Sequence, residues 1–126
     1  MLRDSFGRKV DYLRLSVTDR CDLRCVYCMP PEGIPLKPVS EILTYGELIR
    51  TVRVAVFLGV RKVRITGGEP LVRRDIVSFV RQVAGVPGVL DLGMTTNGTA
   101  LPEMAVPLKE AGLSRVNVSL DTIRRD

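Results

Sequence analysis

Histidine and tryptophan are both absent from the sequence, and its three cysteines all lie within residues 21–28. A structural zinc site closes with four cysteine or histidine ligands, so these three residues need a fourth ligand from elsewhere. Long apolar runs are also missing: the longest, residues 54–60, is far below the roughly 18 residues of a membrane span. The N-terminus lacks the apolar core of a signal peptide. We therefore expect a cytoplasmic protein without membrane contact.

The composition is that of one folded domain, with 126 residues, 45% of them hydrophobic and 26% charged. Nineteen Lys and Arg against 14 Asp and Glu give a formal charge of +5, which is spread along the chain without a long basic run or interleaved aromatics. This distribution disfavours a nucleic-acid groove, so no DNA partner is expected. The basic residues could equally face an anionic small molecule. A reducing compartment fits the cysteines, because an oxidising one would pair two and leave the third.

Strand and helix patterns alternate along the chain. Four segments rich in Val, Leu or Ile are predicted strands: 12–18, 62–66, 90–96 and 115–120. The first helix begins at a capping box of Thr44 and Glu47 and stops at Gly59. The second follows Asp75 and ends at Gly85, and the third has Pro102 near its first turn and ends at Gly112. This order predicts an α/β fold with a parallel sheet.

A long loop, residues 19–43, separates the first strand from the first helix and contains every cysteine. Loops of this length inside a compact domain are usually functional. Three soft thiolates on a cluster of four irons would leave one iron open for a substrate or cofactor. A zinc site completed by a distant carboxylate or another chain, or a redox thiol pair with a spare cysteine, fits the spacing equally well.

The predicted strands alternate between apolar and polar side chains, whereas strands covered by helices on both faces read as continuous apolar runs. We expect the helices to cover the apolar face, which comprises Leu13, Leu15, Val17, Val63, Ile65, Leu92, Met94, Val116, Val118 and Leu120. The opposite face then carries Arg14, Ser16, Arg64, Thr66, Thr95, Asn117 and Ser119. A polar, cationic interior favours a wet cavity that holds a ligand. The alternative is a flat sheet whose polar face simply lies in water.

Two glycines, Gly67 and Gly68, follow the second strand directly and precede Glu69. Glycines at this point allow the backbone to approach a ligand closely, and the carboxyl ends of parallel strands are where such folds place their sites. A glycine pair is also an ordinary turn. Asn97 and Gly98 end the third strand in a similar way.

Four stretches together resemble one known family. They are LRLSVTDRCDLRCVYCMP (13–30), RITGGEPLVRRD (64–75), MTTNG (94–98) and VNVSLDT (116–122). In order and register they resemble the radical S-adenosylmethionine (SAM) GTP 3′,8-cyclases of molybdenum cofactor biosynthesis, the MoaA family. The spacing of the cysteines alone indicates only the radical SAM superfamily, and the flanking motifs point to this member. The resemblance implies that residues 1–126 are the N-terminal part of a radical SAM core domain, a truncated partial (β/α)6 TIM-like barrel with about four parallel strands and three helices.

The resemblance also implies a chemistry. Cys21, Cys25 and Cys28 would hold a 4Fe-4S cluster whose open iron binds SAM. One-electron reduction would cleave SAM to methionine and a 5′-deoxyadenosyl radical, which abstracts hydrogen from the GTP ribose on the way to a cyclised pyranopterin precursor. The matching positions for SAM are Tyr27, Gly68 and Ser119. Those for GTP are Arg14, Arg64 and Thr95, which are the residues that the alternation places on the polar face.

The family extends beyond what this chain contains. In the family, the C-terminal region carries a second 4Fe-4S cluster. The resemblance further implies a one-electron reductant as a partner and a homodimer of the full-length protein. We expect this chain alone to hold the first cluster but not to make the cyclised product. Another radical SAM enzyme, of the peptide-modifying or sulfatase-maturing type, is the alternative enzyme, and a non-catalytic zinc-binding fragment is the alternative outside catalysis.

Overall fold

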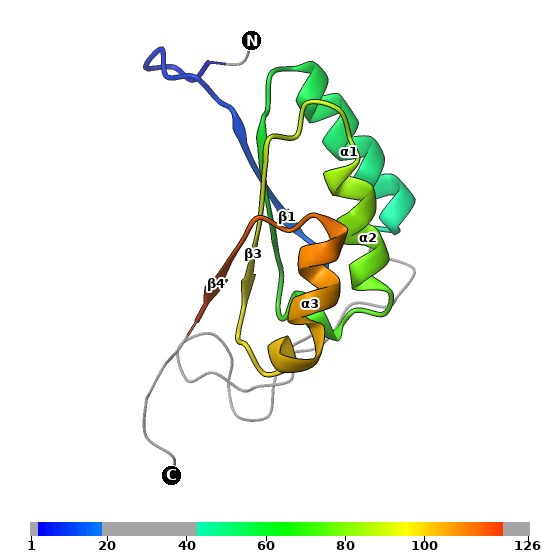
Figure 1. The fold of residues 1–126 in the computed structure, drawn as a ribbon. Coiled ribbons are helices and arrows are strands. Elements are labelled where there is room, and N and C mark those ends of the chain that lie inside the picture. The colour runs from blue at the N-terminus through cyan, green and yellow to red at the C-terminus, as the bar shows by residue number, and fades with distance from the viewer. Residues whose placement is uncertain (1–2, 19–42, 120–126) are drawn as a thin grey trace.

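The computed structural model describes residues 3–18 and 43–119, and strands and helices alternate through them (Figure 1). The strands are β1 (Tyr12–Ser16), β2 (Lys62–Thr66), β3 (Asp91–Thr96) and β4 (Arg115–Val118). The helices are α1 (Tyr45–Phe57), α2 (Ile76–Ala84) and α3 (Leu101–Ala111), and a short 3-10 turn, η2 (Pro70–Val72), follows β2. The predicted order of elements is confirmed, and each predicted helix begins and ends within a residue or two of its expected position.

The four strands form one parallel sheet in the order β1-β2-β3-β4. In register, Leu15 lies beside Ile65, Ile65 beside Met94, and Met94 beside Val116. The three helices lie along one side of this sheet (Figure 1). The predicted α/β class with a parallel sheet is therefore correct.

The helix ends follow from local sequence. The Thr44 hydroxyl accepts a 3.1 Å hydrogen bond from the Glu47 N–H, and the Glu47 carboxylate accepts a 2.9 Å bond from the Thr44 N–H. This reciprocal pair is the predicted capping box, and it satisfies two backbone donors at the start of α1. At the other end of the chain, Gly112 stops α3 with a left-handed φ of 113°, a conformation that glycine adopts without strain.

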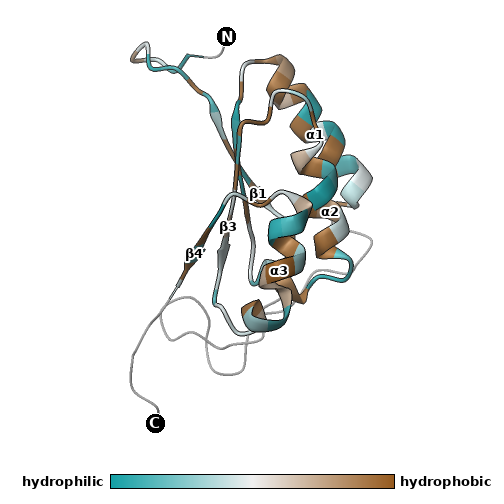
Figure 2. Cartoon of the chain, viewed as in Figure 1, coloured by the Kyte–Doolittle hydropathy of each residue, from teal (hydrophilic) through white to brown (hydrophobic). Residues whose placement is uncertain are grey.

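The core lies between the helices and the apolar face of the sheet. Each helix carries hydrophobic and hydrophilic residues around its circumference (Figure 2), and the hydrophobic positions supply the core. Its buried members are Leu15, Val17, Leu48, Ile49, Val52, Val63, Ile65, Leu71, Ile76, Phe79, Val80, Val83, Val86, Leu92, Met94, Leu108 and Ala111. Each fully buried aliphatic or aromatic side chain stabilises the fold by about 1.5–3 kcal/mol relative to leaving it exposed.

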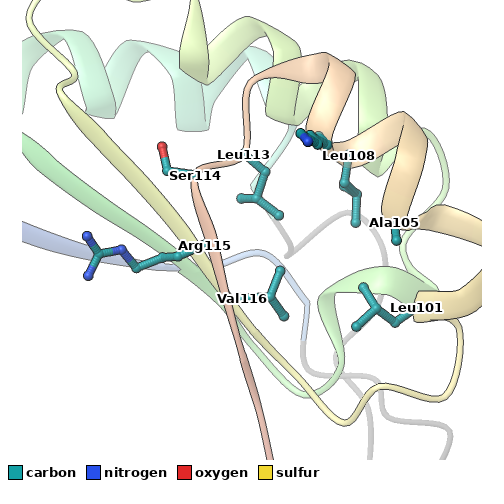
Figure 3. A pocket seen from close by; sticks show the side chains of 8 residues that line it. Leu101, Ala105, Leu108, Leu113, Ser114, Arg115 and Val116 are labelled. Carbon is teal, nitrogen blue, oxygen red and sulfur yellow. The ribbon is translucent and has the colours of Figure 1, made fainter.

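The apolar side of β4 is less covered than the alternation predicted. Val116 is half-buried and Val118 is 51% exposed, and Leu120 lies outside the described residues. Among the described strands β4 pairs only with β3, and on its apolar side Val116 and Leu113 line a pocket together with Leu101 and Leu108 of α3 (Figure 3). Burial thus fades toward the edge of the sheet because a strand position is covered only when a helix lies over it.

No helix among residues 3–18 and 43–119 is long and apolar enough to cross a membrane.

Candidate functional site

The carboxyl ends of the parallel strands bring together several predicted site residues. Gly68 follows β2, and Ser119 follows β4. The Ser119 N–H donates a 2.9 Å hydrogen bond to the Thr96 carbonyl, which places the residue after β4 against the end of β3. The two predicted SAM contacts that the structure describes therefore lie at one edge of the sheet, as the parallel topology requires.

The glycine pair fits closely against the end of β1. A Cβ on Gly67 would lie 2.6 Å from the Thr18 carbonyl oxygen, and Gly67 has a φ of 149°. The Gly68 N–H donates a 2.7 Å hydrogen bond to the same carbonyl. The pair is thus a close contact between two backbone segments, and a ligand amino group, which donates hydrogen bonds, would have to use the Gly68 carbonyl and not its N–H.

Glu69 was assigned no role from the sequence, yet it is the most deeply buried charged side chain among the described residues, with 1% of its surface exposed. One carboxylate oxygen, Oε2, accepts a 2.6 Å hydrogen bond from the Thr96 hydroxyl and a 3.2 Å bond from the Leu71 N–H. The other, Oε1, accepts a 2.8 Å bond from the Asn97 N–H. Three donors compensate the loss of water around the carboxylate and join the turn after β2 to the end of β3. The position of Glu69 directly after the glycine pair could have singled it out in the sequence, but nothing in the sequence indicated that its side chain is buried.

Arg64 lies on the polar face of the sheet and bridges two neighbouring strands. Its Nε donates a 2.6 Å hydrogen bond to the Tyr12 hydroxyl of β1, and its Nη1 donates a 3.3 Å bond to the Thr95 hydroxyl of β3. Arg64 and Thr95 are half-buried, whereas Arg14 on β1 is exposed. The structure thus brings the three residues predicted for GTP onto one face, and it holds one guanidinium in a fixed orientation.

A row of cationic side chains crosses this face. Arg14 lies beside Arg64, Arg64 beside Gly93, and Gly93 beside Arg115. A Cβ on Gly93 would lie 3.1 Å from Cγ of Arg115, so the arginine side chain lies over the glycine. The Arg115 side chain extends to the side of β4 away from Leu113 and Val116 (Figure 3).

The sequence analysis did not place Arg115 on the polar face, although it lies two residues before Asn117 in β4 and therefore on the same face of the strand. Its Nη2 forms a 3.0 Å ion pair with Asp91, which partly offsets its charge on the polar face. The other carboxylate oxygen of Asp91 is buried without a hydrogen-bond partner. The register of the strands, and not the spacing of residues within β4, places Arg115 in the row with Arg14 and Arg64.

The predicted cluster ligands Cys21, Cys25 and Cys28, and Tyr27 beside them, lie outside the described residues. Within residues 3–18 and 43–119, no group of three His, Cys, Asp or Glu side chains is arranged to hold a metal ion. The donor set that the sequence offers, three thiolates without histidine, suits an iron–sulfur cluster.

Comparison with known proteins agrees with this arrangement. The family model of the radical SAM superfamily matches residues 15–126. The chain is 55% identical over 123 residues to a GTP 3′,8-cyclase from Petrotoga mobilis, and 56% identical over 125 residues to one from Geobacter sulfurreducens. It is 54% identical over 125 residues to molybdenum cofactor biosynthesis protein 1 of Drosophila melanogaster. These alignments include 98%, 99% and 99% of the chain, and 38%, 38% and 22% of the relatives. The predicted resemblance to the cyclases is confirmed over nearly the whole sequence.

Solved structures support the fold independently. The structure of BtrN in complex with AdoMet and 2-DOIA superposes with a TM-score of 0.65 at 22% identity, and covers 88% of this chain and 46% of that one. BtrN in an open conformation gives a TM-score of 0.62 at 23% identity, over 88% of this chain and 50% of that one. The predicted fold, part of a TIM-like barrel, agrees with both. The chain spans about 38% of the length of the bacterial cyclases it matches, and it belongs to the radical SAM superfamily.

Proposed function

We propose that this chain forms the SAM-binding part of a GTP 3′,8-cyclase and that the polar face of its sheet binds the GTP triphosphate. The observation that carries the proposal is the Arg64 guanidinium, which Tyr12 and Thr95 hold in place beside the exposed Arg14. The cyclases that the chain matches supply the identity of the substrate. Membership in the radical SAM superfamily implies a 4Fe-4S cluster and SAM.

Cys21, Cys25 and Cys28 are the residues proposed to hold the cluster. When bound and reduced, the cluster would supply the electron that cleaves SAM to a carbon radical. Gly68 is proposed to accept a hydrogen bond from the SAM amino group through its carbonyl, because an amino group donates hydrogen bonds and the backbone carbonyl is the acceptor at this residue. Tyr27 and Ser119 are proposed to contact the adenine and the sugar. A one-electron reductant is needed as a partner.

Arg14, Arg64 and Thr95 are proposed to bind GTP. A planar guanidinium matches the oxygens of a phosphate, and charge-assisted hydrogen bonds of this kind are roughly twice as strong as neutral ones. Arg64 keeps part of its donor set for a ligand, because its hydrogen bonds to Tyr12 and Thr95 use Nε and Nη1 and leave Nη2. The hydroxyl of Thr95 accepts from Arg64 and retains its own hydrogen to donate to the ligand.

The cyclisation itself is proposed to require more of the protein than this chain. The chain spans only 38% of the length of the bacterial cyclases with which it aligns. Incubating the chain as the sole protein with GTP, SAM and a reductant should give no cyclised product, whereas the Geobacter sulfurreducens relative in the same assay serves as the positive control. Product from the chain alone would contradict this part of the proposal.

The first test is anaerobic reconstitution of the chain with iron and sulfide, followed by metal analysis and low-temperature EPR of the reduced sample. We expect iron and sulfide in equal amounts and a reduced-cluster signal that changes when SAM is added. Zinc at about one per chain, with no visible iron–sulfur absorption, would instead support a zinc-binding fragment.

The second test separates the cyclase from other radical SAM enzymes. GTP binding to the reconstituted chain is measured by calorimetry for the wild type, Arg14→Ala and Arg64→Ala, with Arg53→Ala on the exposed surface of α1 as the matched control. Both polar-face variants should weaken GTP binding at least about tenfold, which corresponds to one lost charge-assisted interaction. Indifference to both substitutions would favour an enzyme of the peptide-modifying or sulfatase-maturing type.

A further inference from the structure

Arg73, which follows η2, forms hydrogen bonds to backbone on both sides of residues 19–42. Its Nη1 donates a 2.6 Å bond to the carbonyl of Val17, and its Nη2 donates a 2.8 Å bond to the carbonyl of Leu43. Val17 comes shortly before residues 19–42 and Leu43 directly after them, and all three cysteines lie between these two carbonyls in the sequence. One side chain therefore holds the two ends of the cysteine-bearing segment beside each other.

The position of the guanidinium is itself fixed by the core. It lies 4.0 Å from the centre of the Tyr45 ring, in the geometry of a cation–π contact. Tyr45 stacks on Phe79, with ring centres 4.6 Å apart, and Phe79 is completely buried. The Tyr45 hydroxyl donates a 2.6 Å bond to the Arg74 carbonyl. These contacts tie Arg73 to α1, to α2 and to the turn after β2.

Other bonds hold only the first of the two ends. The Val17 N–H donates to the Thr66 carbonyl at 3.0 Å, and the Gly68 N–H donates to the Thr18 carbonyl at 2.7 Å. Among the hydrogen bonds within residues 3–18 and 43–119, only those of Arg73 join this end to Leu43. A lysine could not replace it fully, because an ammonium is a single point charge whereas a guanidinium presents two parallel donors.

We propose that Arg73 is a positioning residue for the cluster, which it supports by fixing both ends of the segment that carries Cys21, Cys25 and Cys28. The inference rests on the proposed cluster site. Three thiolates can bind one cluster only when the chain brings them together. Holding the two ends of a chain segment side by side lowers the entropic cost of bringing together the groups between them.

The experiment compares the wild-type chain with Arg73→Gln, Arg73→Lys and the matched control Arg74→Gln, whose side chain is exposed on the neighbouring position. Each reconstituted protein is mixed with an iron chelator under anaerobic conditions, and the rate of cluster loss is followed by visible absorption. Hydrogen exchange in the cluster-free proteins, read on peptides that cover Val17 and Leu43, measures whether the two ends are still held. Thermal unfolding of the same samples measures the stability of the fold.

Arg73→Gln should lose its cluster about tenfold faster than the wild type, which corresponds to a loss of about 1.4 kcal/mol in the free energy that holds the cluster. Exchange should rise in the peptides at both ends and stay unchanged in β3. Arg73→Lys should fall between the two, because it keeps the charge but has one nitrogen in place of the two that donate to Val17 and Leu43. Arg74→Gln should match the wild type. If Arg73→Gln does not fold, Arg73→Lys carries the same comparison.

Two results would overturn the positioning role. One is an unchanged rate of cluster loss in the Arg73 variants. The other is a lower unfolding temperature without faster cluster loss, which would make Arg73 a purely structural residue. If the wild-type chain takes up no cluster, the proposed function is wrong and this inference falls with it. That failure is read from the wild type alone and so is distinct from a failure of the variants.

Discussion

The carboxylate of Glu69 and the hydroxyl of Thr96 lie 2.6 Å apart inside the protein, although 27 positions separate the two residues in the sequence. The pair connects the turn after β2 to the end of β3, which are the two segments that carry Gly68 and Thr95. The Thr96 hydroxyl also accepts a 3.1 Å bond from the Gly98 N–H. The Thr96 hydroxyl therefore links the buried Glu69 carboxylate, after β2, to the backbone of the turn after β3.

Replacing Thr96 with valine should destabilise the fold by about 2 kcal/mol. Valine keeps the shape of threonine but removes the hydroxyl, so the buried carboxylate loses its shortest hydrogen bond and the Gly98 N–H loses its acceptor. Urea unfolding measures the change, and Thr99→Val, at an exposed position three residues later, is the control. An unchanged urea midpoint for Thr96→Val would mean that the two backbone donors suffice for Glu69.

Substitution of alanine should have opposite effects at two glycines. Gly67→Ala should lower the free energy of unfolding by more than about 1 kcal/mol, because its Cβ would lie 2.6 Å from the Thr18 carbonyl oxygen at a φ of 149°. Gly46→Ala should stabilise the chain by up to about 1 kcal/mol, since Gly46 is in α1 and the nearest atom to a Cβ there is 3.9 Å away. Equal effects at both sites, measured by urea unfolding, would contradict the close approach at Gly67.

Removing the Tyr12 hydroxyl should weaken GTP binding about fivefold, the effect of one hydrogen bond of about 1 kcal/mol. The hydroxyl accepts from Nε of Arg64 and so holds the guanidinium toward the polar face. Calorimetry on Tyr12→Phe measures the loss. Tyr45→Phe is the matched control, because it also removes a hydrogen-bonded tyrosine hydroxyl but on the helical side of the sheet. Equal affinities for wild type and Tyr12→Phe would show that Arg64 needs no such support.

The capping box predicts how the stability of α1 depends on pH. The N–H of Thr44, which donates to the carboxylate, lowers the pKa of Glu47 below its ordinary value. The folded state then binds this proton less readily than the unfolded state. The stabilisation is therefore complete above the unfolded-state pKa of about 4.3 and is lost as the pH falls through the folded-state pKa.

Urea unfolding of the wild type and Glu47→Gln, from about pH 7 to about pH 3, tests this dependence. The wild type should be the more stable protein at neutral pH, and the difference between the two should shrink as the pH falls. The Arg8 N–H also lowers the pKa of Asp4, so the wild type loses stability in acid for a second reason. The difference between the two proteins cancels that contribution. A constant difference across the range would contradict the role of the Glu47 charge.

Most of the fold could be predicted because its signals are local. The Thr44–Glu47 box marks the start of α1, and the alternation of apolar residues in β1 and β2 identifies the face that the helices bury. The exception is Val118, for which the same alternation predicted burial, yet the residue is 51% exposed. Alternation specifies which side of a strand is apolar, but only a neighbouring element decides whether that side is covered.

Local patterns in the sequence contain the alternation of strands and helices, the polar face with Arg14 and Arg64, and the motifs that identify the family. Pairing of the strands is needed to bury Glu69 against Thr96, to orient Arg64 through Tyr12, and to let Arg73 join the backbone on both sides of the cysteines. The two sets of features differ in how far apart the residues lie along the chain. Periodicity and capping act over a few residues, whereas the hydrogen bonds of these three residues join positions 27, 52 and 56 apart, which meet only when the strands pair.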